Sequence, residues 1–510
     1  MLPALLAAPL AEIAVQMAEQ AGMPSAAPRV ESHLRALVGR VMSPGGWRAG
    51  ERRSGAEPIG TGRTRPYDES TLRKHARELS RSGGTDIVAR AVEASVAQAV
   101  AATGDQAVAY TDIFDQVYWT KEPAHAGPIA NRGNRLLAAT YFGLTFVRPT
   151  HGPVLAYHVS WHKPASPLQD ALEALHAEPR RATWLTAALR RHIWDRGGSG
   201  RPTLRWALAR RIPYLTVSRG STRWTRFRRA PRVHTRGRLP VFVRRDAALL
   251  RDMGRRTVAE RSVVPEEVIF PAHPEKGRTS TRALRYRTGA PLSKDELRDL
   301  DNVYKTRWPC NENPIKALIA VGFDRNLDRG LTLTPSRGTD GRQARLEQRE
   351  QALRDEVAAC QPTSSAQLTK ALARFGHKKR ACDKERTAIQ TIPQDKGARM
   401  PTGAEGLVKN LMLLMYNALA LLLMRSPLEQ VQAMTVHHVY ELLLGRTMLA
   451  CLEAQQTTLW IDPITTTAER PLQDELVRLF NEQSLCLRGL PLYLRLRDSS
   501  GETRPLQVSG

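Results

Sequence analysis

Three carboxylates stand where a strand or helix end would present them. Asp112 lies in the apolar stretch AVAYTDIF, Asp195 ends the stretch HIWD before a glycine turn, and Glu312 opens an apolar helical pattern. Taken singly, each of these acids is explained equally well as a helix cap or a surface group and as a catalytic residue. Three such acids that meet can hold two Mg²⁺ ions, which would clamp an in-line phosphoryl displacement. The residue types therefore predict two-metal phosphoryl transfer if the fold brings them together.

The elements that must position these acids alternate between strand and helix. Apolar and aromatic stretches at 107–114, 136–147 and 153–161 predict strands of one sheet. Helical patterns at 183–192 and 202–211 flank the short strand that ends at Asp195, which places this acid at the carboxyl end of a strand in an α/β fold. The strand that precedes Asp112 favours it over its rival, Asp115.

The charge balance points to a polyanionic partner. The chain has 510 residues, with 76 Lys and Arg against 50 Asp and Glu, a formal net charge of +26. Nucleic acid is the first candidate partner and an acidic membrane surface the second. With 42% hydrophobic and 25% charged residues the chain has globular composition and length for several domains. The cysteines form no CxxC pair, which excludes a zinc ribbon and suits a reducing cytoplasm.

Arginines without lysine mark the middle of the chain. Between Asp195 and Asp246 there is no acid, while fifteen arginines occur. Either the run is a solvated face or its forked guanidinium groups contact phosphates, and the missing acids favour phosphates. Flanking strand patterns predict a small β-rich insertion here. Its candidate DNA-binding residues are Arg219, Arg223, Arg226, Arg228 and Arg229.

Helices are predicted towards both ends of the chain. The N-terminal apolar stretch is typical of an amphipathic helix, and the composition of residues 27–68 predicts a linker. Residues 70–100 predict two helices around Gly83 and Gly84, which form either a helix-turn-helix or an ordinary helical pair. Residues 343–386 predict a charged, protruding helical hairpin with breaks at Pro362 and Gly376. This hairpin contacts either DNA or only water. The apolar run 411–424 is too short to span a membrane and predicts a buried core helix.

Three segments carry a resemblance to a known family. They are YTDIFDQVYWTKEPAHAGPIANRGNRLL, IWDRGGSG and YKTRWPCNENPIK, which contain the three acids in turn. With them the chain resembles the DDE transposases of bacterial insertion sequences over roughly 108–329. The resemblance implies an α/β, ribonuclease-H-like mixed sheet flanked by helices, with the arginine-rich β insertion before the glutamate and added N- and C-terminal helical regions.

The resemblance also implies roles for particular residues. Asp112, Asp195 and Glu312 would be the ligands of two Mg²⁺ ions, with Mn²⁺ tolerated. Tyr304, Arg307 and Lys316 would accompany the glutamate and contact DNA phosphates. The chain departs from the family pattern here, because the gap from Trp308 to Glu312 is one residue longer and the lysine usually stands further along the helix.

These observations predict a DNA transposase that cleaves and joins double-stranded DNA at element ends, acts as a homodimer on DNA, and works in the cytoplasm at the nucleoid, with no membrane partner. The alternatives are a non-catalytic architectural or regulatory DNA-binding protein and a metal-dependent nuclease. The predicted regions are a helical, DNA-binding part with a linker (1–104), the first part of the catalytic core (105–218), the arginine-rich β insertion (219–290), the glutamate-bearing part of the core (291–342), the helical hairpin (343–400) and a C-terminal helical region (401–510).

Overall fold

A computed structural model gives the fold of the protein. It describes residues 10–41, 67–103, 106–118, 138–162, 167–218, 222–223, 232–236, 239–245, 266–271, 282–289, 294–324, 332–333, 337–362, 364–390, 397–398, 403–444, 446, 448–487 and 490–497.

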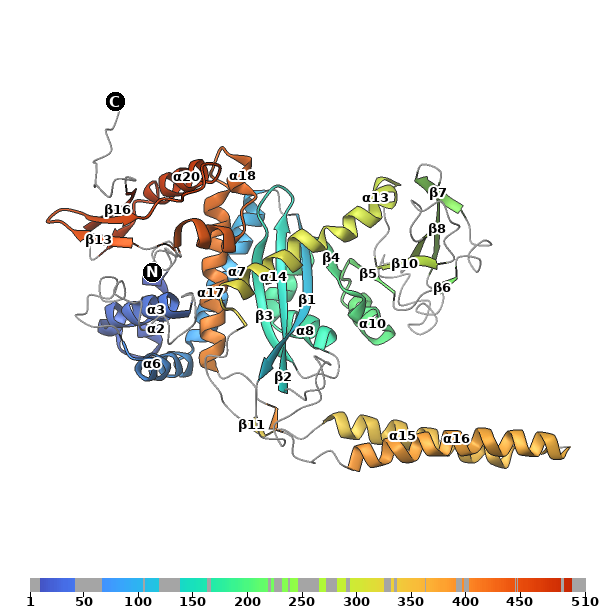
Figure 1. Ribbon diagram of the computed structural model, residues 1–510. Helices are drawn as coiled ribbons and strands as arrows, with labels where there is room; N and C mark the ends of the chain where they lie inside the picture. Colours follow the sequence, from blue (N-terminus) through green and yellow to red (C-terminus); the bar gives the residue numbers. More distant parts are fainter. Residues whose placement is uncertain are drawn as a thin grey trace.

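A mixed β-sheet forms the centre of the molecule (Figure 1). Its strands around the acids follow the order β3-β2-β1-β4-β5. Their bounds are β1 (Ala107–Tyr118), β2 (Ala138–Pro149), β3 (Leu155–His162), β4 (Leu189–Trp194) and β5 (Tyr214–Val217). The first three strands pair antiparallel, whereas β4 runs parallel to β1 and to β5. Their apolar and β-branched side chains suit strands that are buried on both faces.

Helices cover both faces of this sheet. They include α7 (Gly84–Ala102), α8 (Pro167–Leu175) and α17 (Gly403–Leu423). On β2, Phe142 packs into the core shared with α7 and α17, whereas the next residue, Gly143, lies against Ala171 of α8. Because successive strand residues face opposite sides, α8 covers the face opposite to α7 and α17. The predicted mixed α/β fold with a helix-flanked sheet is therefore confirmed.

The most apolar helix, α17, is a core helix, as the run 411–424 predicted. By length and composition it resembles a membrane span, but 83% of its most apolar window is buried inside the protein. Asn417 on α17 covers the outer strand β3: its Oδ1 accepts from the Ala156 N–H at 2.7 Å, and its Nδ2 donates to the Ala156 carbonyl at 2.8 Å. The polar residue in the apolar run thus satisfies the backbone of an edge strand.

The N-terminal part is more helical than the sequence indicated. Its helices are α2 (Leu10–Gln20), α3 (Ala27–Val41), α6 (Glu69–Arg81) and α7, with the short 3₁₀ turn η1 (Pro24–Ala26) after α2. The predicted linker from Ala27 to Asp68 is wrong for its first part, because α3 buries Leu34 and Leu37 there. Pro28 lies in the first turn of α3, where a missing N–H costs no intrahelical bond. Residues 42–66 lie outside the described part.

The pair α6 and α7 surrounds the expected glycine turn. Asp68 caps α6 by accepting from the Thr71 N–H at 2.8 Å, and Gly83 turns the chain with a φ of +79°. However, α7 packs on β3 and α17 and buries Ile87 and Val92. A recognition helix needs a free face to enter a DNA groove. The packing of α7 therefore favours the ordinary helical pair over the helix-turn-helix.

One continuous hydrophobic core joins both ends of the chain to the sheet. It contains Met17 of α2, Phe146 of β2, Leu414 of α17 and Leu479 of α20 (Arg470–Asn481). The described residues of regions 1–104 and 401–510, which were predicted as regions separate from the catalytic core, therefore share one hydrophobic core with the sheet. The reason is that α7 and α17 bury their apolar faces on each other and on the sheet.

Beyond β5 the sheet continues through the predicted arginine-rich insertion. Its strands are β6 (Thr222–Arg223), β7 (Arg232–Arg236), β8 (Leu239–Arg245), β9 (Glu266–Pro271) and β10 (Arg282–Thr288). β10 pairs antiparallel with β5, and the order runs on through β9 and β8 to β7. Of the side chains from 219 to 290, the structure describes only those of 286–289.

A long hairpin extends away from the body of the molecule (Figure 1). It consists of α15 (Arg337–Ala358) and α16 (Ser365–Gln390), and the short strands β11 (Thr332–Leu333) and β12 (Gly397–Ala398) pair at its base. The predicted break at Gly376 is wrong, since α16 continues through it. A glycine costs a helix only about 1 kcal/mol. Arg374 and Lys378, on either side of Gly376, both pair with Glu356 of α15 and hold the helix there.

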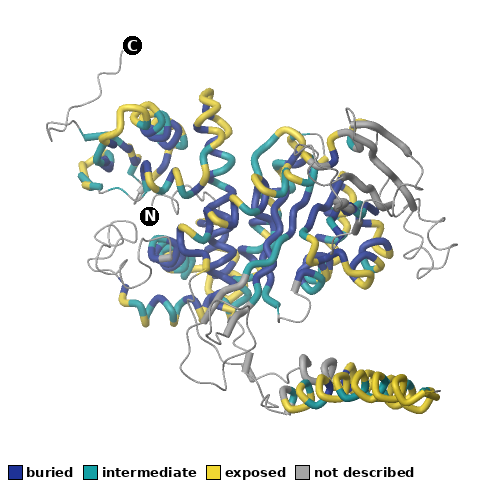
Figure 2. The backbone as a smooth tube through the Cα atoms, turned by 45° about the vertical axis from the view of Figure 1, so that its right-hand side comes forward, coloured by how far each residue is buried: buried dark blue, intermediate teal, exposed yellow. Residues whose placement is uncertain are grey.

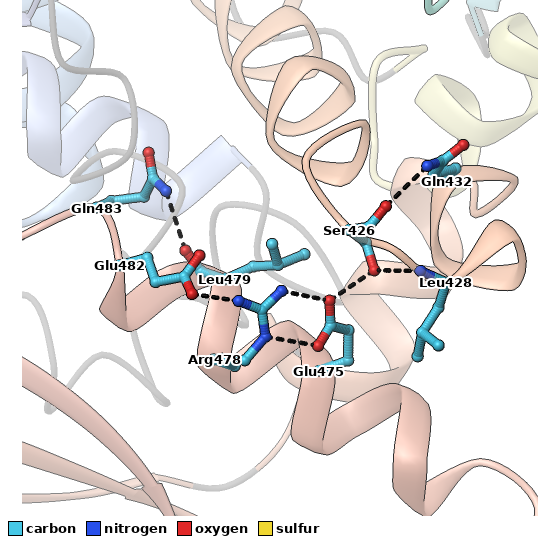
Figure 3. Close-up of polar contacts among 8 residues, drawn as sticks. All are labelled: Ser426, Leu428, Gln432, Glu475, Arg478, Leu479, Glu482 and Gln483. Atoms are coloured by element: carbon cyan, nitrogen blue, oxygen red, sulfur yellow. Dashed lines mark hydrogen bonds and ion pairs between the residues drawn. The ribbon is translucent and has the colours of Figure 1, made fainter.

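The C-terminal part contains a second sheet, so its prediction as helical was incomplete. The order is β13-β14-β16-β15, from β13 (Met448–Leu452), β14 (Thr457–Ile461), β15 (Cys486–Leu487) and β16 (Leu490–Leu496). Between α17 and this sheet lie α18 (Glu429–Gln432), α19 (Val436–Val439) and η7 (Tyr440–Leu444). Figure 3 shows the contacts that attach α20 to the segment after α17. Ser426 Oγ donates to Glu475 Oε1 at 2.6 Å, and Arg478 forms an ion pair with Glu475, with Nη2 and Oε1 2.7 Å apart.

Two histidines are buried beside the central sheet. His176 follows α8 and His192 lies on β4, where its Nε2 is 2.7 Å from Thr111 Oγ1. Burial lowers the pKa of His176 to about 4 and holds the pKa of His192 well below its usual range. Both imidazoles are therefore neutral in the folded protein at neutral pH.

These histidines predict a loss of stability in acid. Between about pH 6.5 and 4, the unfolded chain binds protons that the folded imidazoles reject, so the free energy of unfolding should fall as the pH falls. The contribution of His176 is complete above its unfolded pKa and disappears as the pH approaches about 4. Urea unfolding at a series of pH values measures this fall. In His176→Gln the fall should be smaller by up to about 3 kcal/mol, and identical profiles would contradict the prediction.

Candidate active site

The register of the sheet brings the two aspartates together. β1 and β4 are parallel neighbours, and Thr111 pairs with Trp194. Asp112 and Asp195 each follow one of these residues, so they occupy adjacent positions on strands that lie about 4.8 Å apart. The pairing of β1 with β4 thus brings together two acids that are far apart in the sequence.

The glycine turn after Asp195 fixes the backbone of this acid. Asp195 opens the short 3₁₀ turn η3 (Arg196–Gly198), which leads into α10 (Arg201–Ala209). The Trp194 Nε1–H donates to the Gly198 carbonyl at 3.2 Å, and a Cβ on Gly198 would lie 2.7 Å from the Trp194 ring. Thr216 of β5 donates to the Asp195 carbonyl at 3.1 Å. Glycine is therefore required at position 198 because the preceding indole packs against the turn.

Glu312 lies at the end of a π-helical turn. This turn, η6 (Trp308–Glu312), separates α13 (Lys294–Lys305) from α14 (Asn313–Ala320), and the Asn313 N–H donates to the Trp308 carbonyl five residues back. Pro309 and Pro314 have no N–H, so two bonds of a regular α-helix are missing here. A π turn accommodates one extra residue and is frequent at functional sites.

The π turn has a direct consequence for the site. Residues three and four apart are neighbours on an α-helix, but Arg307 and Glu312 are five apart. The wider turn nevertheless places the Arg307 Nη2 2.5 Å from Glu312 Oε1.

All three acids converge on the guanidinium of Arg307. Its Nη1 lies 2.5 Å from Asp112 Oδ2, and its Nη2 lies 3.7 Å from Asp195 Oδ1 as well as close to Glu312. The side chains of Asp112 and Glu312 are each 18% exposed, and that of Asp195 is 38% exposed. The site is therefore a half-buried group of three carboxylates, of which Asp195 is the most exposed. The structure joins Asp112 to the other two acids, whereas the side chain of its rival, Asp115, lies outside the described residues.

The electrostatics of the site oppose three charged carboxylates. Burial raises the pKa of Asp112 to about 6, against the lowering effect of Arg307, and the neighbouring Asp195 and Glu312 raise it further. Burial disfavours the charged form of Arg307, but the same acids outweigh that effect and raise its pKa. A second positive charge at this point would therefore stabilise the site.

The donor set suits a hard divalent cation. Carboxylate oxygens are the ligands that Mg²⁺ prefers, and the partial exposure of Asp195 leaves room for water ligands. Within the described ranges, no group of His, Cys, Asp and Glu side chains already surrounds a metal position, because Arg307 lies between the three acids. The residues present fit Mg²⁺ once this guanidinium moves aside.

The other residues around the glutamate lie on the same helical segment. Tyr304 is half-buried against Tyr286, with ring centroids 5.4 Å apart, and burial raises its pKa to about 12. The Arg307 guanidinium lies 5.9 Å from the centre of the Tyr304 ring. Lys316 is exposed one turn after Glu312, and its Nζ lies 5.2 Å from the centre of the Trp308 ring, whose residue is 55% exposed. Lys316 is therefore accessible to a ligand, whereas Tyr304 is largely covered.

The arginine candidates of the insertion are not placed at the site. Arg219, Arg226, Arg228 and Arg229 lie outside the described residues. Arg223 belongs to the backbone of β6, which pairs with β10, and its side chain is not described. Their predicted contact with DNA remains a prediction.

Supporting residues that the sequence did not reveal hold the helical segment on the sheet. Tyr110 lies on β1, and its Oη is 3.0 Å from Thr306 Oγ1. Tyr110 is two residues before Asp112 and Thr306 is one residue before Arg307, so this hydrogen bond sets the distance between strand and arginine. A tyrosine in an apolar strand has no sequence signal that distinguishes this role from ordinary packing.

No protein-family model matches the chain, and no curated protein matches it significantly.

Proposed function

We propose that the protein is a DDE-type DNA transposase, which cleaves and joins DNA strands at the ends of an insertion sequence by two-metal phosphoryl transfer. The observation that carries the proposal is the convergence of Asp112, Asp195 and Glu312, from three separate elements, on one point. A protein that only binds DNA gains nothing from three carboxylates held together beside phosphates.

The fold supports the same proposal. The mixed sheet flanked by helices, with three antiparallel strands followed by two parallel ones, is compatible with the ribonuclease-H-like domain that the resemblance implies. In this interpretation the strands after β5 are an insertion before the glutamate. The net charge of +26 suits double-stranded DNA as the partner. We infer that the protein acts on DNA as a homodimer in the cytoplasm.

Each residue of the site has a task in this mechanism. Asp112, Asp195 and Glu312 would hold two Mg²⁺ ions, which supply a stronger nucleophile and stabilise the leaving oxygen. With these carboxylates engaged, the forked donors of Arg307 would be available to bind the scissile phosphate. Lys316, exposed beside the glutamate, can neutralise a neighbouring phosphate. Burial raises the pKa of Asp112 to about 6, so at neutral pH this carboxyl is still mostly ionised and can act as a ligand.

Strand cleavage tests this proposal. The substrate is a supercoiled plasmid that carries the gene with its flanking DNA, incubated with Mg²⁺ or with EDTA. We expect Mg²⁺-dependent nicks at fixed positions on both sides of the gene, followed by joining of the 3′ ends to target DNA. Asp195→Asn should bind the same DNA but not cleave it. Salt-sensitive binding without any cleavage would instead support an architectural protein.

A second expected result concerns Arg307. Removing it as Arg307→Ala leaves three carboxylates facing one another, so the variant should lose on the order of 2 kcal/mol of stability without metal. Mg²⁺ should then raise its Tm more than it raises the Tm of the wild type, because the cation replaces the lost positive charge. Arg307→Lys, which keeps the charge, is the matched control. Equal Mg²⁺ shifts in all three proteins would contradict a metal position beside Arg307.

A further inference from the structure

The outer face of α16 is an exposed surface that the proposed active site does not use. Figure 2 shows the hairpin of α15 and α16 beside the body, exposed along most of its length. Its helices pack mainly on each other. The hairpin contains about fifty residues and does not enlarge the hydrophobic core of the protein. A function of the hairpin would therefore lie on its outer faces.

Charged residues of both signs lie along the hairpin. The described acids of the hairpin all have partners within it. Glu350, Glu356 and Glu385 pair with cations across the seam between the helices. Asp383 pairs with Arg386, while Glu347 and Asp355 accept from glutamines of α15.

Four basic residues on the outer face have no such partners. Lys370, His377, Arg380 and Lys384 are all exposed, and none of them forms an ion pair or a hydrogen bond with a described residue. Residues seven apart share one side of a helix, so Lys370, His377 and Lys384 form a line, and Arg380 lies beside it. We call these four residues the α16 stripe. Between them stand Ala373 and Gly376, whose small side chains allow another molecule to approach the helix closely.

The dimensions of the α16 stripe match duplex DNA. From Lys370 to Lys384 the helix rises by about 21 Å, at 1.5 Å per residue. A DNA strand of that length contains roughly six phosphates, at 3.4 Å along the helix axis. The exposed apolar residues of α16, Leu368 and Leu372, lie on another side of the helix, so the stripe lacks the apolar face that a membrane-bound helix needs.

We propose that the α16 stripe binds the phosphate backbone of duplex DNA, outside the segment that enters the active site. The proposal rests on the proposed function in so far as DNA is the substrate. The hairpin follows the glutamate-bearing α14 in the chain and leads into α17, so both of its chain ends join the catalytic body at the base of the rod, and DNA bound along it would be tied to the body there. We expect this contact to be independent of the base sequence, because contacts to phosphates position DNA without reading its bases.

The salt dependence of DNA binding tests the proposal. The probe is a fluorescein-labelled duplex of random sequence and about 40 base pairs, several times the length that the stripe spans, and anisotropy gives its affinity from about 50 to 300 mM NaCl. The variant Lys370→Gln/Lys384→Gln removes two charges, and glutamine is a good helix former. We expect its slope of log K against log salt to be less steep than wild type by about 1.8, since each phosphate contact contributes about 0.9.

The control removes two charges from other faces of the same rod. Arg354 and Lys379 are exposed, and Arg354→Gln/Lys379→Gln should leave the slope unchanged. Equal changes in both variants, or no change in either, would overturn the proposal. Plasmid cleavage by the same proteins separates the two failures: if wild type cleaves while the stripe variant binds DNA normally, only the hairpin inference is wrong. A wild type that neither binds nor cleaves DNA would reject the proposed function itself.

Discussion

Glu312→Gln should lower the rate of strand cleavage by about a thousandfold or more while DNA binding persists. The change replaces a charged oxygen ligand with a neutral amide of the same shape. Metal ions contribute several kcal/mol to a phosphoryl-transfer transition state, and each 1.36 kcal/mol corresponds to a factor of ten in rate. Plasmid nicking with Mg²⁺ gives the rate, and anisotropy with labelled DNA gives the binding.

Glu296→Gln is the matched control for this variant. Glu296 lies on α13, is 15% exposed against 18% for Glu312, and pairs with Arg190 and Arg191 at 2.9 Å each. It has the same charge, similar burial and arginine partners, but no contact with the other two acids. The control should cleave DNA. If both variants lost activity alike, loss of any buried glutamate would explain the result and Glu312 would have no special role.

Lys409→Met should be among the most destabilising single substitutions in the described core, costing about 3 to 5 kcal/mol. Lys409 and Glu405 are one turn apart on α17, both fully buried, with Nζ and Oε1 3.8 Å apart. The Lys409 ammonium also donates to the Phe323 carbonyl and lies 4.8 Å from the centre of the Phe323 ring. Removing it leaves the Glu405 carboxylate without this counter-charge in the core.

Urea unfolding measures this loss, and a double variant serves as its control. Glu405→Leu/Lys409→Met removes both charges, and replacing a buried pair by apolar residues is often neutral or stabilising. The double variant should therefore recover most of the stability that the single one loses. A single variant within about 1 kcal/mol of wild type would show that the pair contributes little. Because Phe323 follows α14, this pair also ties the glutamate-bearing helix to α17.

The parts of the fold that the sequence predicted are those with strong local patterns. The strands around Asp112 alternate or run apolar between turn residues, and they appear at β1, β2 and β3. The helix expected over 183–192 ends earlier, since α9 (Pro179–Ala188) gives way to β4 at Leu189. Its last residues, LRRH, have helical propensity, but pairing with β1 places them in a strand. Here tertiary pairing overrides local preference.

Other elements could not be predicted because their cause is not local. The strands β13 and β14 are only five residues long, and their apolar face is defined by packing on the C-terminal core rather than by alternation. The hydrophobic faces of α7 and α17 gave no indication that they pack on each other across more than three hundred residues. Such contacts are set by the whole chain.

The candidate site shows the same division. The three acids could be selected because each stands at the end of an element or in a strand where a charge is unexpected. The position of Arg307 between them could not, because it depends on the π turn at Pro309 and on the hydrogen bond from Tyr110 to Thr306. Sequence reasoning gave Arg307 a role on DNA phosphate, whereas the structure places it on the acids.

The covering of β3 by α17 has a consequence for synthesis on the ribosome. The strand ends at His162 and the helix that covers it begins at Gly403, about 240 residues later. At 5 to 20 residues per second, translation takes roughly 12 to 50 seconds to span that interval. During this time the nascent sheet has an apolar face that α17 does not yet cover, the kind of exposed surface that promotes aggregation during folding. A chain that ends between Glu312 and Gly403 would therefore contain all three acids and yet lack the helix that covers β3.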